Sequence, residues 1–291
     1  MTPFVADINT QANLRLYLIT NDPEIADYAC QINDLWPFVD LEYIGKCDRQ
    51  GNVDSWKSHH TLDDVARVRE AVPGAPILVR INPLNGGSKQ EIDEVIARGA
   101  DAIMLPMFED LDTLSRFHDI LRERALSVPL FETVGAIHIL SEAVANQPMD
   151  ALHIGLNDLS LELGLTFMFE CISEGVLEDP AIVLRAAGMQ FGIGGVGRVG
   201  ASNLPATYIL GEHVRLGSSA AILSRSFHGF ATTKCEMMTN LDFVKEVGRL
   251  RNEYVQFKNA STIELEANRQ KFVEKTNEVS RIIGSKCRSI I

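Results

Sequence analysis

The sequence predicts an α/β protein, a (β/α)8 TIM barrel with additional C-terminal helices. Short apolar runs alternate with amphipathic segments, and the apolar runs number eight. Such alternation is typical of a parallel sheet with right-handed crossovers, and eight repeats predict closure into a barrel. An open doubly wound sheet is the alternative. Its usual glycine-rich loop after the first strand is missing, because Thr20-Asn21-Asp22-Pro23 stands there.

The expected strands are the apolar runs, each bounded by turn residues. They span residues 14–19, 38–43, 77–81, 102–105, 130–132, 151–154, 191–193 and 214–216. Helices are expected between them at 23–34, 61–71, 89–98, 111–123, 136–145, 180–187 and 204–212.

The character of the chain changes after residue 226. An amphipathic helix is expected at 241–258 and a second at 261–283, opened by a capping box and stopped by Gly284. Apolar residues in the second helix recur every seven positions, at Leu265, Phe272 and Val279. We therefore predict a catalytic barrel domain at 1–230 and a helical extension at 231–291 that packs in an oligomer.

Composition bounds the function. The chain has 291 residues and a formal net charge of −12, from 27 basic and 39 acidic side chains. We find neither the basic stripe of a nucleic-acid-binding protein nor the long apolar run of a membrane protein. The first 13 residues are polar and lack a signal-peptide core. The five cysteines form no Cys-x-x-Cys pair, so reduced thiols in a cytoplasmic protein are expected.

Two carboxylates define the predicted functional site. Glu132 ends the strand at 130–132, and Asp158 follows the strand at 151–154. Strand C-terminal ends converge on one mouth of a barrel, so the two acids are expected to face each other there. Such hard ligands suit Mg²⁺, or else Mn²⁺ or Co²⁺, with substrate and water completing the coordination. Roles at helix starts, with Glu132 in a first turn and Asp158 as an N-cap, are the alternative.

Charged side chains also follow the second and third strands. Asp40 and Glu42 are two residues apart and share a face of their strand. Arg80 follows the apolar residues 77–79, where its burial is costly unless it meets an anion. At the mouth its planar fork suits a substrate carboxylate. An ion pair with Glu42 or Glu132 is the alternative.

Two glycine-containing segments are candidate anion sites. Gly155-Leu156-Asn157-Asp158 precedes a short helix, whose first N–H groups are placed to take the second oxygen of the same carboxylate. The stretch 192–198 follows the seventh strand, where barrels often cradle an anion, although a tight loop explains it equally well.

Two adjacent histidines lie in the long loop after the second strand. His60, or with less support His59, is the candidate general base, because imidazole accepts a proton near neutral pH. A solvated loop histidine is the alternative for either residue.

Five motifs then occur in one order along residues 14–226. They are Phe38-Val39-Asp40-Leu41-Glu42, Val79-Arg80-Ile81-Asn82-Pro83, Gly99-Ala100-Asp101-Ala102-Ile103-Met104-Leu105-Pro106, Glu132-Thr133-Val134-Gly135-Ala136 and Ile154-Gly155-Leu156-Asn157-Asp158-Leu159-Ser160. As an ordered set they resemble the HpcH/HpaI aldolase and citrate lyase β-subunit family, of the phosphoenolpyruvate/pyruvate barrel superfamily.

The resemblance implies a metal-dependent class II aldolase or lyase. Such enzymes cleave or form a carbon–carbon bond between pyruvate, or a related 2-oxo acid, and an aldehyde through a metal-stabilised enolate. It implies Mg²⁺ at Glu132 and Asp158, with Arg80 and the backbone of Gly155, Asn157 and Asp158 on the 2-oxo acid. Arg80, His60 and Glu42 are the expected catalytic residues. The resemblance also implies a homo-oligomer, a trimer or a hexamer.

Tyr43 departs from the family pattern. Pyruvate aldolases carry a histidine directly after the strand-two acid, and acyl-CoA lyases usually carry a second acid, whereas here Tyr43 follows Glu42. Two alternatives therefore stay open. One is an acyl-CoA lyase of the citryl-CoA or malyl-CoA type, whose CoA phosphates would need the basic residues Lys46, Arg49, Arg198 and Arg225. The other is a barrel that binds a 2-oxo acid or a phosphorylated ligand without turnover.

Overall fold

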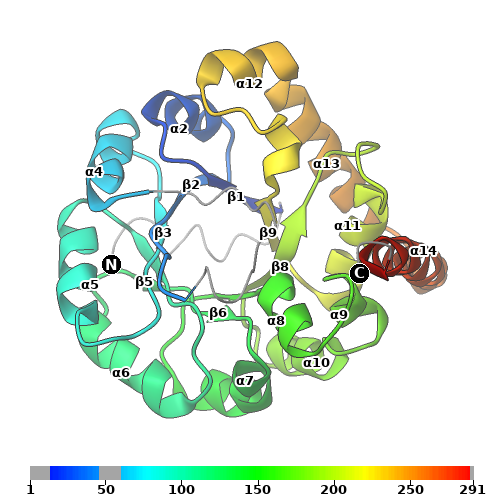
Figure 1. The fold of residues 1–291 in the computed structure, drawn as a ribbon, viewed down its shortest axis with the longest axis horizontal. Coiled ribbons are helices and arrows are strands. Elements are labelled where there is room, and N and C mark those ends of the chain that lie inside the picture. The colour runs from blue at the N-terminus through cyan, green and yellow to red at the C-terminus, as the bar shows by residue number, and fades with distance from the viewer. Residues whose placement is uncertain (1–13, 46–59, 289–291) are drawn as a thin grey trace.

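A ring of parallel strands surrounded by helices forms the body of the protein (Figure 1). The computed structural model describes residues 14–45 and 60–288, with only the backbone for 286–288. The strands are β1 (Arg15–Ile19), β2 (Leu35–Asp40), β3 (Leu78–Arg80), β4 (Ala102–Met104), β5 (Leu126–Ser127), β6 (Leu130–Phe131), β7 (Leu152–Ile154), β8 (Phe191–Val196) and β9 (Ala220–Leu223). Their order is β5-β4-β3-β2-β1-β9-β8-β7-β6, and every pair is parallel.

The sheet closes through the segment 126–131, which contains both β5 and β6. On the β4 side, the Val128 N–H donates to the Ile103 carbonyl. On the β7 side, the Pro129 carbonyl accepts from the His153 N–H. The two short strands are thus one barrel position, interrupted at a proline that has no N–H to donate. The predicted fold class is confirmed, with eight positions around a closed barrel.

Helices cover the outside of this ring. They are α2 (Pro23–Cys30), α4 (Leu62–Ala71), α5 (Ser88–Ala97), α6 (Leu111–Leu121), α7 (Val134–Asn146), α8 (Leu156–Glu162), α9 (Glu170–Ser173), α10 (Glu178–Ala186) and α11 (Ala206–Leu216), followed by the 3₁₀ helix η1 (Arg225–His228), α12 (Lys234–Asn240), α13 (Phe243–Lys258) and α14 (Thr262–Arg288).

Several expected elements or boundaries are wrong. The apolar run 214–216 is the last turn of α11, which ends at Gly217 with φ 90°, and the last strand is β9. A short apolar run fits a helix end as well as a strand, so periodicity alone does not separate them. The second strand runs from Leu35 to Asp40 rather than 38–43. Helix α14 continues through Gly284 to Arg288 because a glycine permits a helix stop without forcing one.

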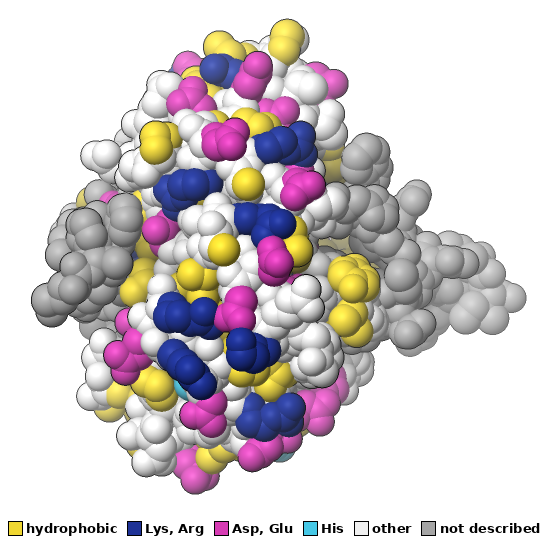
Figure 2. All heavy atoms as spheres, turned by 90° about the vertical axis from the view of Figure 1, so that its left-hand side faces the viewer, with side chains coloured by type: hydrophobic (Ala, Val, Ile, Leu, Met, Phe, Trp, Pro, Cys, Tyr) yellow, Lys and Arg dark blue, Asp and Glu magenta, His cyan; other side chains and the backbone are white. Residues whose placement is uncertain are grey.

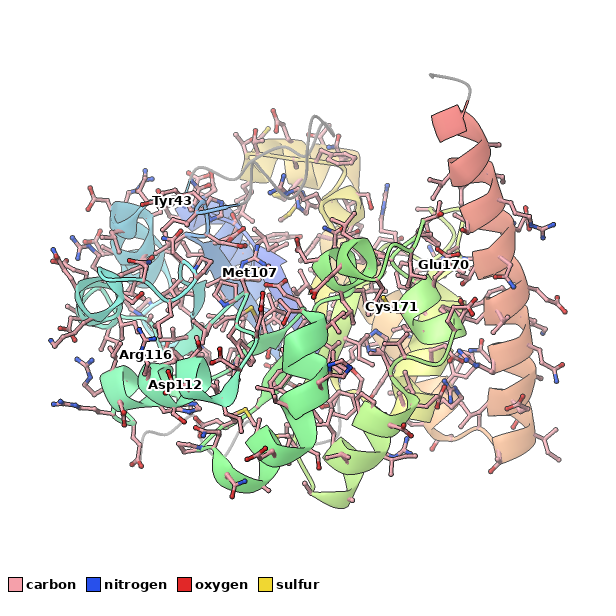
Figure 3. The ribbon with its side chains drawn as sticks, turned by 60° about the horizontal axis from the view of Figure 1, so that its bottom comes forward. Tyr43, Met107, Asp112, Arg116, Glu170 and Cys171 are labelled. Atoms are coloured by element: carbon pink, nitrogen blue, oxygen red, sulfur yellow. The ribbon has the colours of Figure 1, made fainter. Side chains whose placement is uncertain are left out.

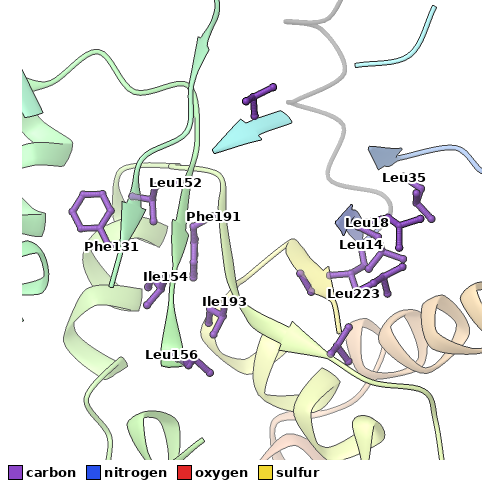
Figure 4. Close-up of a cluster of buried hydrophobic side chains, with 14 of the residues drawn as sticks. Leu14, Leu18, Leu35, Phe131, Leu152, Ile154, Leu156, Phe191, Ile193 and Leu223 are labelled. Carbon is purple, nitrogen blue, oxygen red and sulfur yellow. The ribbon is translucent and has the colours of Figure 1, made fainter. Parts of the chain in front are cut away.

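Alternation along the strands sorts side chains between two cores. One group points into the barrel: Tyr17, Trp36, Phe38, Leu78, Ala102, Met104, Leu126, Val128, Leu130, Ala151 and Ala220. Their strand neighbours, such as Phe131, Leu152, Ile154 and Phe191, point outward into the layer beneath the helices (Figure 4). This period of two carries the next inward positions, at the C-terminal strand ends, to the barrel mouth.

The C-terminal helices pack against the barrel of their own chain. Phe243 and Leu250 of α13 are fully buried, and the Tyr254 hydroxyl donates to the Ser218 carbonyl. Helix α14 runs along the outside beside Glu170 and Cys171 of α9 (Figure 3). Phe272 is fully buried and meets the Phe169 ring edge-on. Phe272 and Val279 of the apolar stripe are therefore buried within one chain and Leu265 is half-buried, which weakens one reason for expecting an oligomer. The oligomer and the domain boundary at 230 stay predictions.

A network of four charged side chains fixes α14 to the barrel. We call Glu178, Glu212, Arg215 and Arg269 the dock cluster. Arg215 donates to Glu212 at 2.9 Å and to both oxygens of Glu178 at 2.7 and 2.9 Å. Arg269 of α14 reaches Glu212 at 3.2 Å and the carbonyls of Ile172 and Ser173.

Gly211 allows α14 to approach α11 closely. A Cβ on this residue would lie 2.1 Å from Asn268 Nδ2, which donates to the Tyr208 carbonyl. The glycine therefore has a packing reason within the helix pair.

The surface is mixed in charge. On the face formed by α4, α5 and α6, basic and acidic side chains are interspersed and apolar ones are scattered (Figure 2). None of the helices in the described ranges combines the length and apolarity that a membrane crossing requires. Cys30, Cys171 and Cys235 are free thiols.

Candidate functional site

Five charged residues gather at the C-terminal strand ends, and we call them the mouth cluster: Asp40, Glu42, Arg80, Glu132 and Asp158. Arg80 donates from Nε and Nη2 to the two oxygens of Asp40, at 2.9 and 2.8 Å. Its Nε also lies 3.4 Å from Glu42 Oε2. The expected alternative of an ion pair is thus present, with Asp40 as the main partner and Glu42 as the second.

This pairing uses one edge of the Arg80 guanidinium. The side chain is 14% exposed, and no bond from Nη1 to another described residue is recorded. Asp40 raises the pKa of Arg80, so the guanidinium stays charged. An arginine oriented in this way has a second edge for an anion in the mouth.

Glu132 is buried among negative charges. It is 3% exposed, directly before Thr133, the N-cap of α7, and so lies outside the helix. Burial raises the pKa of Glu132 to about 8; Arg80 opposes this rise, and the charges of Asp158 and Glu42 add to it. Asp158 is in the first turn of α8, whose N-cap is Gly155. The structure thus brings Glu132 and Asp158 close enough for mutual repulsion.

Two backbone features hold the Glu132 carboxylate in place. Met107 has φ 54°, unusual for a side chain of its size, and its N–H donates to Glu132 Oε1 at 3.2 Å. A Cβ on Gly155 would lie 2.7 Å from Glu132 Cβ and 2.9 Å from Oε2. Sequence reasoning missed Met107, because no local signal marks a methionine for the left-handed region. It found Gly155, but for a different role.

The expected backbone donors are partly occupied. The Gly155 N–H donates to the Phe131 carbonyl within the barrel, so it is already used. Asn157 is exposed on α8, and its carbonyl accepts from Ser160 Oγ. The N–H groups of Leu156 and Asn157 lie in the first turn of α8 and are candidate substrate donors.

His60 contacts the mouth cluster through the backbone of Asp40. Its Nδ1 accepts from the Asp40 backbone N–H at 3.0 Å. In the neutral ring the other nitrogen, Nε2, then carries the proton, so the imidazole is arranged to donate rather than to accept. His59, Lys46 and Arg49 lie outside the described residues.

Tyr43 lies away from the barrel interior. It is 71% exposed, and its backbone N–H donates to Asn82 Oδ1 (Figure 3). It lines a pocket of about 520 Å³ between the segments that follow β2 and β3, together with Leu41, His60 and Asn82.

The glycine-rich stretch is mostly strand rather than loop. Gly192 and Gly194 lie within β8, which corrects the expected end at Ile193. A Cβ on Gly192 would lie 2.3 Å from His153 Nδ1, and Gly194, with φ 48°, packs against Leu156. These two glycines therefore make room for buried side chains, and only Gly197 and Arg198 extend beyond the strand.

The residues at the mouth fit a hard divalent cation. Two buried or half-buried carboxylates that repel each other would gain from a shared positive charge. Among residues 14–45 and 60–285, no group of three or more His, Cys, Asp or Glu side chains is placed to hold a metal ion. An ion held by Glu132 and Asp158 would therefore take its remaining ligands from substrate and water.

Comparison with known proteins supports the fold. No protein-family model and no curated protein matches the chain. A solved HpcH/HpaI aldolase from Desulfitobacterium hafniense DCB-2 is 14% identical, with a TM-score of 0.58 over 81% of this chain and 96% of that one. A HpcH/HpaI aldolase/citrate lyase family protein from Burkholderia cenocepacia J2315 is 15% identical, with a TM-score of 0.58 over 77% and 93%.

A third solved structure is the citrate lyase beta subunit of M. tuberculosis, complexed with oxaloacetate and magnesium. It is 16% identical, with a TM-score of 0.54 over 84% of this chain and 99% of that one. The resemblance predicted from the ordered motifs is thus confirmed at the level of the fold.

Proposed function

We propose that this protein is a divalent-metal-dependent carbon–carbon lyase of the aldolase type that acts on pyruvate or a related 2-oxo acid. The observation that carries the proposal is the repelling pair Glu132 and Asp158 beside Arg80, whose side chain is 14% exposed. Mg²⁺ is the expected ion; when bound it would act as a Lewis acid on the 2-oxo acid and ease loss of a proton from C3. The similarity in fold to aldolase and citrate lyase structures supports this reading.

The chain's own residues would position the substrate and move the proton. Arg80, oriented by Asp40, would hold the carboxylate through the guanidinium edge that Asp40 leaves open. Glu42 is buried 3.4 Å from Arg80 and is the candidate proton acceptor. His60 would donate from Nε2, because Nδ1 accepts from the backbone. Burial of this cluster excludes water from the charges that form.

The test needs no knowledge of the aldehyde. In D₂O with Mg²⁺, the protein should exchange the methyl protons of pyruvate for deuterium, and proton NMR measures the rate of this exchange. Glu132→Gln and Asp158→Asn should each abolish the exchange, and Glu42→Gln should slow it roughly 100-fold while oxalate still binds. Glu278→Gln is the matched control, since its exposed carboxylate pairs with Lys275 of the same helix, α14, far from the mouth cluster in sequence.

Two results would contradict the proposal. Exchange that is equal in the wild type and in Glu132→Gln would show that the pair holds no catalytic ion. Tight oxalate binding with no exchange at any pH would favour the binding barrel without turnover. In Arg80→Lys, weaker oxalate binding is expected because an ammonium lacks the planar fork, and unchanged binding would make Arg80 purely structural.

A further inference from the structure

The barrel mouth has a second side that the proposed reaction does not use. Strands β8 and β9 lie across the ring from β3 and β5 (Figure 1). Val196 pairs with Leu223, and the Ser224 N–H donates to the Val196 carbonyl at 2.9 Å. The next residues, Gly197-Arg198 and Ser224-Arg225, therefore leave the sheet side by side. Two arginines thus follow adjacent strand ends.

Arg225 lies close to the mouth cluster. It lies close enough to Asp40 and Arg80 for both charges to act on it: burial lowers the pKa of Arg225, Asp40 opposes this, and Arg80 adds to it. Arg225 opens the 3₁₀ helix η1, in which residues three apart eclipse, so His228 shares its face. His228 is 8% exposed, and its Nδ1 has no hydrogen-bond partner among the described residues.

The same corner holds further donors. Arg198 Nε is buried without a hydrogen-bond partner in the described part of the chain. The hydroxyls of Ser224 and Ser226 lie 2.8 Å apart. A Cβ on Gly197 would lie only 3.7 and 3.9 Å from these two hydroxyls, so the glycine leaves the approach to them open. Guanidinium and hydroxyl groups in this arrangement suit a compact anion.

We propose that Arg198 and Arg225 form a second anion-binding subsite, which binds a second carboxylate or phosphate group on the substrate. This proposal rests on the proposed function, in which Arg80, and the ion that Glu132 and Asp158 would hold, bind the first anionic end of the substrate. The mouth is divided: acids and Arg80 follow β2, β3, β6 and β7, and the arginine pair follows β8 and β9. The substrate class is therefore a 2-oxo acid with a second anionic group.

Matched ligands separate the second charge from the first. 2-Oxoglutarate carries a second carboxylate, 3-phosphohydroxypyruvate carries a phosphate, and 2-oxopentanoate has neither. Calorimetric titration of the Mn²⁺-loaded full chain gives the ratio of the 2-oxopentanoate Kd to that of each charged ligand. We expect a ratio of roughly ten or more for at least one of them in the wild type. The larger ratio identifies carboxylate or phosphate as the preferred group.

Variants then assign the preference. Arg198→Gln and Arg225→Gln should each bring the ratio close to one while 2-oxopentanoate binds as before, and Arg225→Lys should recover part of it. Arg116→Gln is the charge-matched control, because Arg116 is exposed on α6. A wild-type ratio near one, or a ratio unchanged in both glutamine variants, would overturn the subsite and leave the proposed function standing. Failure of all three ligands to bind would overturn the proposed function as well.

Discussion

The mouth cluster and the dock cluster are both networks of charged side chains that are buried or partly buried, but their charge balance differs. The dock cluster sets two carboxylates against two guanidinium groups, and Arg269 also donates to the carbonyls of α9. The mouth cluster sets four carboxylates against Arg80, with Arg225 at its edge. A balanced network satisfies itself within the fold, whereas one with excess negative charge favours an added cation. Position in the barrel and charge balance together distinguish a structural network from a ligand site.

The largest expected effect is on the free energy of unfolding, and it tests the dock cluster. Glu212 is fully buried between Arg215 and Arg269, so Glu212→Gln leaves both guanidinium groups with the partly exposed Glu178 as their shared carboxylate. We expect a loss of about 3 kcal/mol in the free energy of unfolding, measured by urea denaturation. Glu278→Gln, in an exposed pair, should cost less than about 0.5 kcal/mol. Equal small losses in both would show that the dock cluster does not hold α14.

The second prediction tests the unbalanced side. Burial raises the pKa of Glu132 to about 8, so its carboxyl is largely neutral at pH 7 without a bound ion, and Glu132→Gln should change the free energy of unfolding by less than about 1 kcal/mol. Mn²⁺ affinity, measured by calorimetry, should fall at least roughly 100-fold, because even outer-shell changes cost 10–100-fold. Marked destabilisation with unchanged affinity would remove the distinction between the two clusters.

A pH titration probes the neutral histidine beside each cluster. Burial lowers the pKa of His153 to about 4 and that of His213 to about 3, with Arg80 acting on the first and His153 on the second. Their unfolded value is about 6.5, so the unfolded chain binds more protons between these limits. The contribution of the two neutral histidines to the free energy of unfolding is fully present above pH 6.5 and decreases as the pH falls towards 4.

Each histidine should account for a loss of roughly 1–2 kcal/mol in the free energy of unfolding between pH 7 and pH 5. Urea denaturation at each pH measures this loss. His153→Gln should flatten this slope by about half. If stability is constant over this range, the two histidines are not held neutral by burial.

The smallest effect is expected at Tyr43, next to the mouth cluster in sequence but exposed in the structure. Tyr43→Phe should change the free energy of unfolding by less than about 0.5 kcal/mol. It should also leave the pyruvate exchange rate within roughly twofold, because the ring lies outside the barrel interior. A strong loss of exchange would instead make the tyrosine hydroxyl a proton-transfer group.

The sequence predicted the parts of the site that depend on regular structure. Alternation along strands and convergence of strand ends place Glu42, Arg80 and Glu132 on one mouth without any tertiary information. Which residues pair with one another at the site depends on tertiary contacts and could not be predicted. The preference of Arg80 for Asp40, and the His60 nitrogen that accepts from Asp40, follow from contacts between distant segments. The left-handed Met107 departs from its residue preference, so no propensity indicates it.

Pairing of β1 with β9 has a consequence for how the chain acquires its structure. Arg15 pairs with Ala220, 220 − 15 = 205 residues later, and Arg251 of α13 donates to the Leu14 carbonyl. During synthesis from the N-terminus, β1 therefore cannot pair with β9 until most of the polypeptide has been made. Until then the apolar side chains that face the barrel interior, among them Tyr17, Trp36 and Phe38, belong to an incomplete sheet with an unpaired edge, which is prone to aggregation. Ring closure of such long range is slow, so the nascent half-barrel is the stage at which chaperones would act on this protein.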